Sequence, residues 1–78
     1  PRHIVTILQS ARNPKSRAEL QKGAELRDRD HFRQAYLEPL IEAGFVAMTA
    51  PDNPRSSQQR YFTTPAGEKL LERERGDA

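Results

Sequence analysis

The stretch Asp28 to Gly44, with the sequence DRDHFRQAYLEPLIEAG, constrains the fold of this chain more than any other segment. Asp28 suits the N-cap of a helix, because its carboxylate can accept a hydrogen bond from a first-turn amide. Gly44 suits the left-handed conformation that closes a helix. The apolar residues between them recur with helical spacing and predict one broad buried face: Phe32, Tyr36, Leu37, Leu40 and Ile41.

A proline interrupts this helix, and polar residues occupy its other faces. Pro39 lacks an amide hydrogen and its ring clashes with the carbonyl four residues earlier, so we expect a kink or a change of turn between Ala35 and Pro39. The polar faces carry Arg29, Arg33 and Gln34. Such a helix could enter the major groove of DNA, or it could be an ordinary amphipathic helix.

Composition limits the classes of protein to which the chain can belong. Its 78 residues are 31% charged and 35% hydrophobic, which indicates one small soluble domain. It has no cysteine, which excludes disulfides and thiolate zinc sites, and its apolar runs fall far short of the roughly 20 residues that cross a bilayer. We therefore expect a cytoplasmic protein without a membrane partner. Because it begins with Pro1, we expect a piece of a longer polypeptide, whose remainder is a partner.

The charge is distributed unevenly along the chain. Residues 1–33 hold eight Lys or Arg against four Asp or Glu, a net charge of +4, and residues 34–78 hold five against seven, a net charge of −2. A local positive charge of this kind attracts phosphate even when the total is only +2. A solvated basic surface with no partner is the alternative interpretation.

The flanking segments carry their own start and stop signals. Ser16 and Glu19 have the spacing of a capping box, which predicts a second helix that buries Ala18 and Leu20 and stops at Gly23. Thr64 followed by Pro65 predicts the N-terminus of a last helix, which Leu70 and Leu71 would attach to the core. These signals predict helices at 1–10, 16–23, 28–43 and 64–73, with a hairpin at 45–63 that has a polar tip.

Residues for catalysis or metal binding are sparse. His3 and His31 are the only histidines and lie far apart in the sequence, and the serines of the hairpin tip have no neighbouring histidine. The glycines stand singly, so none forms a phosphate-cradling loop. We expect no catalytic residue, no metal and no cofactor, and therefore no enzyme.

Three stretches resemble a known family: SRAEL at 16–20, DRDHFRQAYLEPLIEAGFV at 28–46 and PDNPRSSQQRYFTTPAG at 51–67. They resemble the winged-helix domain at the C-terminus of some bacterial Fic-family (filamentation induced by cAMP) proteins, and a similar module ends RecG-like, AlbA-domain helicase-related regulators. The resemblance implies an α+β, mostly helical winged helix-turn-helix, with three helices, a two-stranded antiparallel wing and a C-terminal helix. It also implies a regulatory or DNA-binding appendage rather than the catalytic part.

On this interpretation the helix at 28–43 enters the major groove of double-stranded DNA and the wing contacts the backbone. Arginine can bind guanine through two hydrogen bonds, glutamine can pair with adenine, and wing arginines can reach phosphate. The acids on the helix and Pro39 confine groove contact to Arg29–Gln34. The candidate DNA-binding residues are Arg27, Arg29, Arg33, Gln34, Arg55 and Arg60.

A second hypothesis is a protein-interaction or dimerisation module that has the same fold and no affinity for DNA. Phe62 and Thr63 stand where the family pattern has a polar residue followed by an apolar one. If Tyr61 and Thr63 point inward, the alternation of a strand turns Phe62 outward, where an exposed aromatic ring marks a candidate protein interface or homodimer contact.

Overall fold

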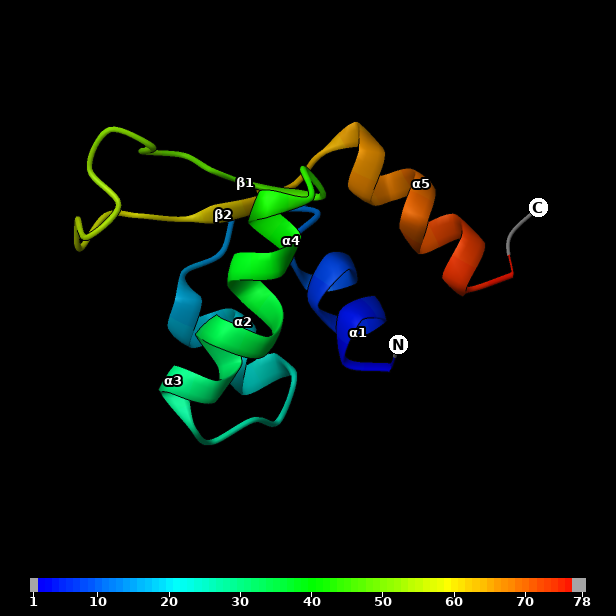
Figure 1. Ribbon diagram of the computed structural model, residues 1–78, viewed down its shortest axis with the longest axis horizontal. Helices are drawn as coiled ribbons and strands as arrows, with labels where there is room; N and C mark the ends of the chain where they lie inside the picture. The colour runs from blue at the N-terminus through cyan, green and yellow to red at the C-terminus, as the bar shows by residue number, and fades with distance from the viewer. Residues whose placement is uncertain (1, 77–78) are drawn as a thin grey trace.

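The computed structural model describes residues 2–76 and shows a small α+β, mostly helical protein with a two-stranded antiparallel sheet (Figure 1). The loop between the strands extends to one side of the helices, and the last helix lies on the other. Pro1, where we expected the first helix to start, lies outside the described residues. The elements in order are α1 (Arg2–Ser10), α2 (Arg17–Gly23), α3 (Arg29–Phe32), a π-helical turn η1 (Arg33–Leu37), α4 (Glu38–Glu42), β1 (Val46–Met48), β2 (Tyr61–Thr63) and α5 (Pro65–Glu74).

The capping box at the start of α2 is confirmed. The Ser16 hydroxyl accepts a hydrogen bond from the Glu19 amide at 3.1 Å, and the Glu19 carboxylate accepts one from the Ser16 amide at 2.9 Å. Leu20 is buried as expected, but the prediction for Ala18 is wrong, because this residue is exposed. Residues two apart on a helix face in different directions, and Leu20 shares its face with Ala24 instead.

α2 ends at Gly23, where we expected it to stop, and the chain reverses direction two residues later, at Glu25. Glu25 has a φ of 59°, the left-handed conformation, whereas Gly23 ends the helix itself. The Glu25 amide donates to the Lys22 carbonyl and the Leu26 amide to the Gln21 carbonyl, which is the bonding of a Schellman cap. Leu26 consequently packs against the core.

α3, η1 and α4 follow one another without a break and form one long helix. The change of turn predicted before Pro39 is the π-helical turn η1 in the middle of this long helix. Glu38 donates its amide hydrogen to the carbonyl of Arg33, five residues earlier, rather than to the carbonyl four residues earlier. The wider turn brings Phe32 and Leu37, which are also five residues apart, into the same core, with exposures of 0% and 2%. The expected ends are also confirmed, since Asp28 caps the helix and Gly44 has a φ of 81°.

The strands pair in an antiparallel register that sets Ala47 opposite Phe62. Each strand is three residues long. β2 also pairs on its other side with Lys15, whose amide and carbonyl bond to Tyr61 at 3.0 and 2.7 Å, a contact that sequence analysis did not foresee. Tyr61 packs on the core and Phe62 does not, yet Phe62 is partly buried, and no large hydrophobic side chain is exposed in the described part of the chain.

The last helix is tied to the end of the long helix. Thr64 caps α5 by accepting from the Gly67 amide at 3.1 Å, and its hydroxyl donates to the Gly44 carbonyl at 2.6 Å. Leu71 is fully buried and Leu70 packs beside it, so both leucines attach the helix to the core as predicted. α5 continues to Glu74, one residue past the expected end.

Candidate functional site

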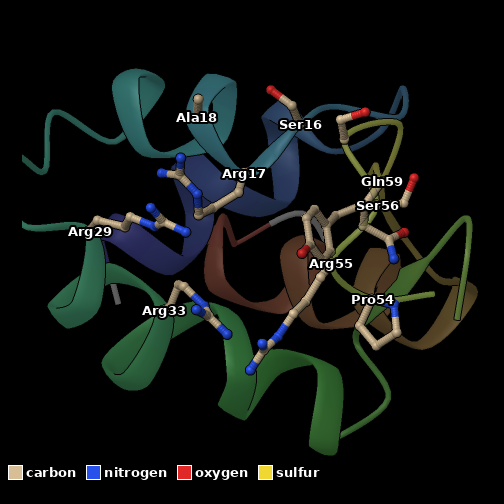
Figure 2. A pocket seen from close by; sticks show the side chains of 11 residues that line it. Ser16, Arg17, Ala18, Arg29, Arg33, Pro54, Arg55, Ser56 and Gln59 are labelled. Carbon is tan, nitrogen blue, oxygen red and sulfur yellow. The ribbon is translucent and has the colours of Figure 1, made fainter.

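An open cleft of about 500 Å³ lies between the helices and the loop that joins the strands (Figure 2). Its walls come from three separate parts of the sequence: the start of α2, the long helix, and the loop before β2. The residues that line it are Ser16, Arg17, Ala18, Arg29, Arg33, Pro54, Arg55, Ser56, Ser57, Gln59 and Tyr61.

The cleft is strongly basic. Arg17, Arg29, Arg33 and Arg55 all line it, and none of the residues that line it is acidic. Figure 2 shows that these four side chains come from α2, from the long helix and from the loop before β2. Four guanidinium groups gathered in one hollow repel each other, and an anion in the cleft would relieve that repulsion.

The four arginines differ in their existing partners. Arg17 donates to the side chain of Gln21, and Arg33 forms an ion pair with Glu38 at 3.3 Å. The side chains of Arg29 and Arg55 have no hydrogen bond or ion pair with any described residue. At least two of the four groups therefore offer their full set of donors to a ligand.

The loop before β2 forms one wall of the cleft, and its conformation is stabilised by Gln59, a buried polar residue with 6% exposure. Its side-chain amide accepts from the Ala50 amide at 2.9 Å and donates to the Ala50 and Asn53 carbonyls at 2.7 and 3.3 Å. The loop also has backbone hydrogen bonds of its own, from the Asn53 amide to the Ala50 carbonyl and from the Ser56 amide to the Asn53 carbonyl. The Gln59 side chain adds to them and joins the two ends of the segment that carries Arg55.

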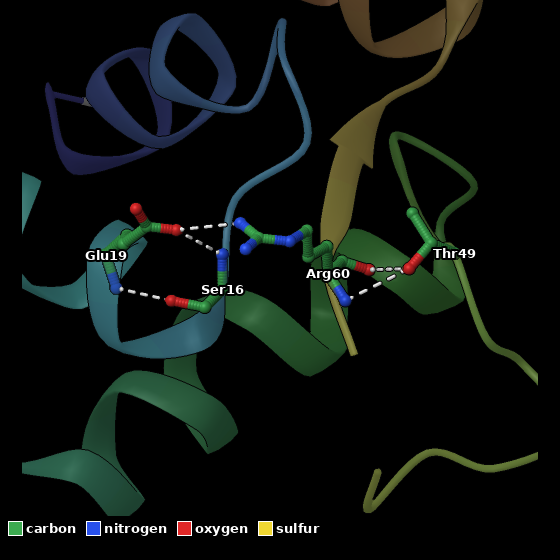
Figure 3. A network of polar contacts seen from close by, with 4 residues as sticks. All are labelled: Ser16, Glu19, Thr49 and Arg60. Atoms are coloured by element: carbon green, nitrogen blue, oxygen red, sulfur yellow. Dashed lines mark hydrogen bonds and ion pairs between the residues drawn. The ribbon is translucent and has the colours of Figure 1, made fainter. Parts of the chain in front are cut away.

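The base of the loop is joined to the start of α2 by a second contact (Figure 3). Arg60 donates to the Glu19 carboxylate at 3.2 Å, the same carboxylate that accepts from the Ser16 amide, and the Arg60 backbone exchanges hydrogen bonds with Thr49. Hydrogen bonding by the Ser16 backbone and side chain, followed by the positive charge of Arg60, lowers the pKa of Glu19. The carboxylate therefore stays charged, and Arg60 is directed to Glu19.

The structure brings together three of the six residues chosen from the sequence. Arg29, Arg33 and Arg55 line the cleft. The other three do not line it. Arg27 borders a second open hollow beside α2, of about 530 Å³, which shares Arg17 and Ala18 with the cleft. Gln34 is exposed outside the cleft, and Arg60 is paired with Glu19.

Arg17 is the cleft arginine that was not among the residues chosen from the sequence. It follows directly after Ser16, the N-cap of α2, so its position at the first turn of a helix was readable. Its proximity to the long helix and the loop was not, because that depends on how three separate segments pack.

The described residues show neither a metal site nor a membrane-spanning helix. They contain no group of three or more His, Cys, Asp and Glu side chains that could hold a metal ion. Instead, His3 and His31 each pack edge-on against the Tyr36 ring, with centroids 5.4 and 5.8 Å away. Among the same residues, no helix has the length and apolar character needed to cross a membrane.

A family model described as the C-terminal domain of "Filamentation induced by cAMP protein Fic-like" proteins matches residues 2–64. The chain belongs to this family of Fic-like C-terminal domains. The match contains all four arginines of the cleft, both strands and the Thr64 cap of α5.

One solved structure supports the same assignment. The crystal structure of a Fic family protein from Desulfovibrio desulfuricans G20 is 36% identical to this Fic-like domain, with a TM-score of 0.68. The alignment covers 78% of this chain and 19% of that protein, so the domain corresponds to about a fifth of its length. No curated protein matches the chain. Neither match supports the resemblance to AlbA-domain, RecG-like regulators.

Proposed function

We propose that this chain is a winged-helix domain of a larger Fic protein and that it binds the phosphate backbone of double-stranded DNA. The observation that carries the proposal is the cleft lined by Arg17, Arg29, Arg33 and Arg55 without an acid among its lining residues. The arrangement of elements supports it, because the long helix forms one wall of the cleft and the loop between the strands forms the other, as a recognition helix and a wing would.

The cleft favours contact with phosphate over contact with bases. Arginine is the side chain that best matches phosphate geometry, because its planar fork donates two parallel hydrogen bonds. Gln34 and Arg27 stand outside the cleft and are the residues left to read base edges.

A titration with duplex DNA at several salt concentrations tests the proposal. Binding through the four arginines should give a plot of log binding constant against log salt concentration with a slope of about −3.6. Arg29→Ala or Arg55→Ala should weaken binding and flatten the slope by about one. Arg73→Ala on α5, which removes the same charge outside the cleft, is the matched control. Absence of binding at low salt, or binding that is independent of salt, would contradict the proposal.

A further inference from the structure

Among the cleft arginines, Arg33 is distinguished by a carboxylate partner within the described residues. Its Nη2 lies 3.3 Å from Oε2 of Glu38. Glu38 does not line the cleft, whereas Arg33 does, so the pair directs one of the four cationic groups toward an acid at the cleft edge.

The π-helical turn creates this pair. Arg33 and Glu38 are five residues apart, a spacing at which side chains of a regular α-helix do not face each other. The turn η1 bonds the Glu38 amide to the Arg33 carbonyl and so places the two residues one wide turn apart. Pro39, which has no amide hydrogen to continue the regular pattern, follows immediately.

The pair is weak enough to be exchanged. The side chains of Arg33 and Glu38 are 46% and 49% exposed, so water already competes for both charges. Exposed ion pairs of this kind contribute little to stability. A phosphate oxygen is an equally charged acceptor, and in the cleft it would be held by the neighbouring arginines as well.

We propose that Glu38 is a built-in competitor for DNA: it occupies Arg33 in the free protein and is displaced when a phosphate enters the cleft. This inference rests on the proposed function. It makes Glu38 a residue that sets affinity without touching the ligand, by reducing the number of free guanidinium groups that meet the backbone. The remaining cleft arginines then provide the first contacts, and Arg33 joins them after the exchange.

Glu38→Gln tests the displacement, because it removes the charge and keeps the size of the side chain. Glu42→Gln removes the same charge one turn further along, from an exposed residue that has no ion pair among the described residues. The Glu38→Gln protein should bind duplex DNA about two- to fivefold more tightly than the Glu42→Gln protein does. Thermal unfolding of the two variants should differ little, which separates an effect on binding from an effect on folding.

The same pair of variants in an Arg33→Ala background isolates the interaction. If Glu38 acts through Arg33, the advantage of Glu38→Gln disappears there. If the advantage persists without Arg33, or if Glu38→Gln binds no better than Glu42→Gln in the wild-type background, the displacement is wrong although the chain still binds DNA. If the unsubstituted chain shows no binding at low salt, the proposed function fails and the displacement fails with it.

Discussion

Gly67 shows most directly how a single residue limits this fold. A Cβ at this position would lie 2.1 Å from the Phe45 carbonyl oxygen and 2.6 Å from Cγ2 of Thr63. The oxygen belongs to the backbone and cannot rotate away. We expect Gly67→Ala to lower the free energy of unfolding by about 2–3 kcal/mol, measured by denaturant titration.

Gly23→Ala is the matched control, because the added methyl would meet only the Ser10 hydroxyl, at an ordinary 3.4 Å. That change should be neutral or slightly stabilising, since alanine favours a helix more than glycine does. Equal destabilisation by both changes would show that close approach is not the cause at Gly67.

Gln59 tests whether the loop wall of the cleft depends on one side chain. Gln59→Glu keeps the shape and the acceptor for the Ala50 amide but sets a carboxylate against the Ala50 carbonyl, now 2.7 Å from a donor. We expect a loss of about 1–3 kcal/mol at neutral pH. Stability should partly return at acid pH, because protonation of the introduced carboxyl restores a donor. Amide hydrogen exchange at Ala50 measures both effects, and exchange rates equal to those of the unsubstituted chain would contradict this role.

The residues that could be predicted from the sequence are those that interact with near neighbours along the chain. Residues that interact with distant parts of the chain could not be predicted in this way. Ser16, Asp28 and Thr64 act on amides three residues away, so spacing alone identified all three caps. Gln59 and Gly67 look like ordinary loop and helix residues in the sequence. Their importance depends on neighbours that only the folded chain brings close.

At the scale of elements, the π-helical turn determines which faces of the long helix are buried. Phe32 and Leu37 share the core only because the turn between them is one residue wider than an α-helical turn. Deleting the exposed Ala35 together with Pro39→Ala should leave a regular helix in which the two residues are four apart and still share a face. We expect circular dichroism and thermal unfolding to report a folded protein with a free energy of unfolding changed by less than about 1 kcal/mol.

Deletion of Gln9 provides the comparison, because this residue is equally exposed but lies in the regular helix α1. Its loss rotates the buried Ala11 away from Ile7 and Leu8 and should destabilise the fold strongly. If the deletion in the π-helical turn is as damaging as the deletion in α1, the turn does more than accommodate one extra residue.

The order and type of elements were predictable, because amphipathic spacing and proline positions record them in the sequence. The change of turn before Pro39 was anticipated for the same reason, although its form as a π-helical turn was not. The pairing of Lys15 with Tyr61 was not predictable, since a single bridging residue leaves no periodic pattern. That bridge joins the start of α2 to the hairpin and helps to set the distance across the cleft.

Over the chain as a whole, the distribution of charge predicted only part of the site. Arg17, Arg29 and Arg33 belong to the basic first part of the chain, but Arg55 comes from the acidic second part. Packing brings it to the others, while Glu19 directs Arg60 elsewhere. The cleft is therefore a property of the fold, and net charge by segment could not have delimited it.

Mapping the contact surface by NMR tests most directly whether this cleft is where DNA binds. We predict that duplex DNA shifts the amide signals of residues that line the cleft, above all Arg17, Arg29 and Arg55, together with side-chain signals of their guanidinium groups. Signals on α5 and around Phe62 should move little. Shifts that cluster on the Phe62 side of the sheet and leave the four arginines unchanged would contradict the assignment of this cleft as the DNA site.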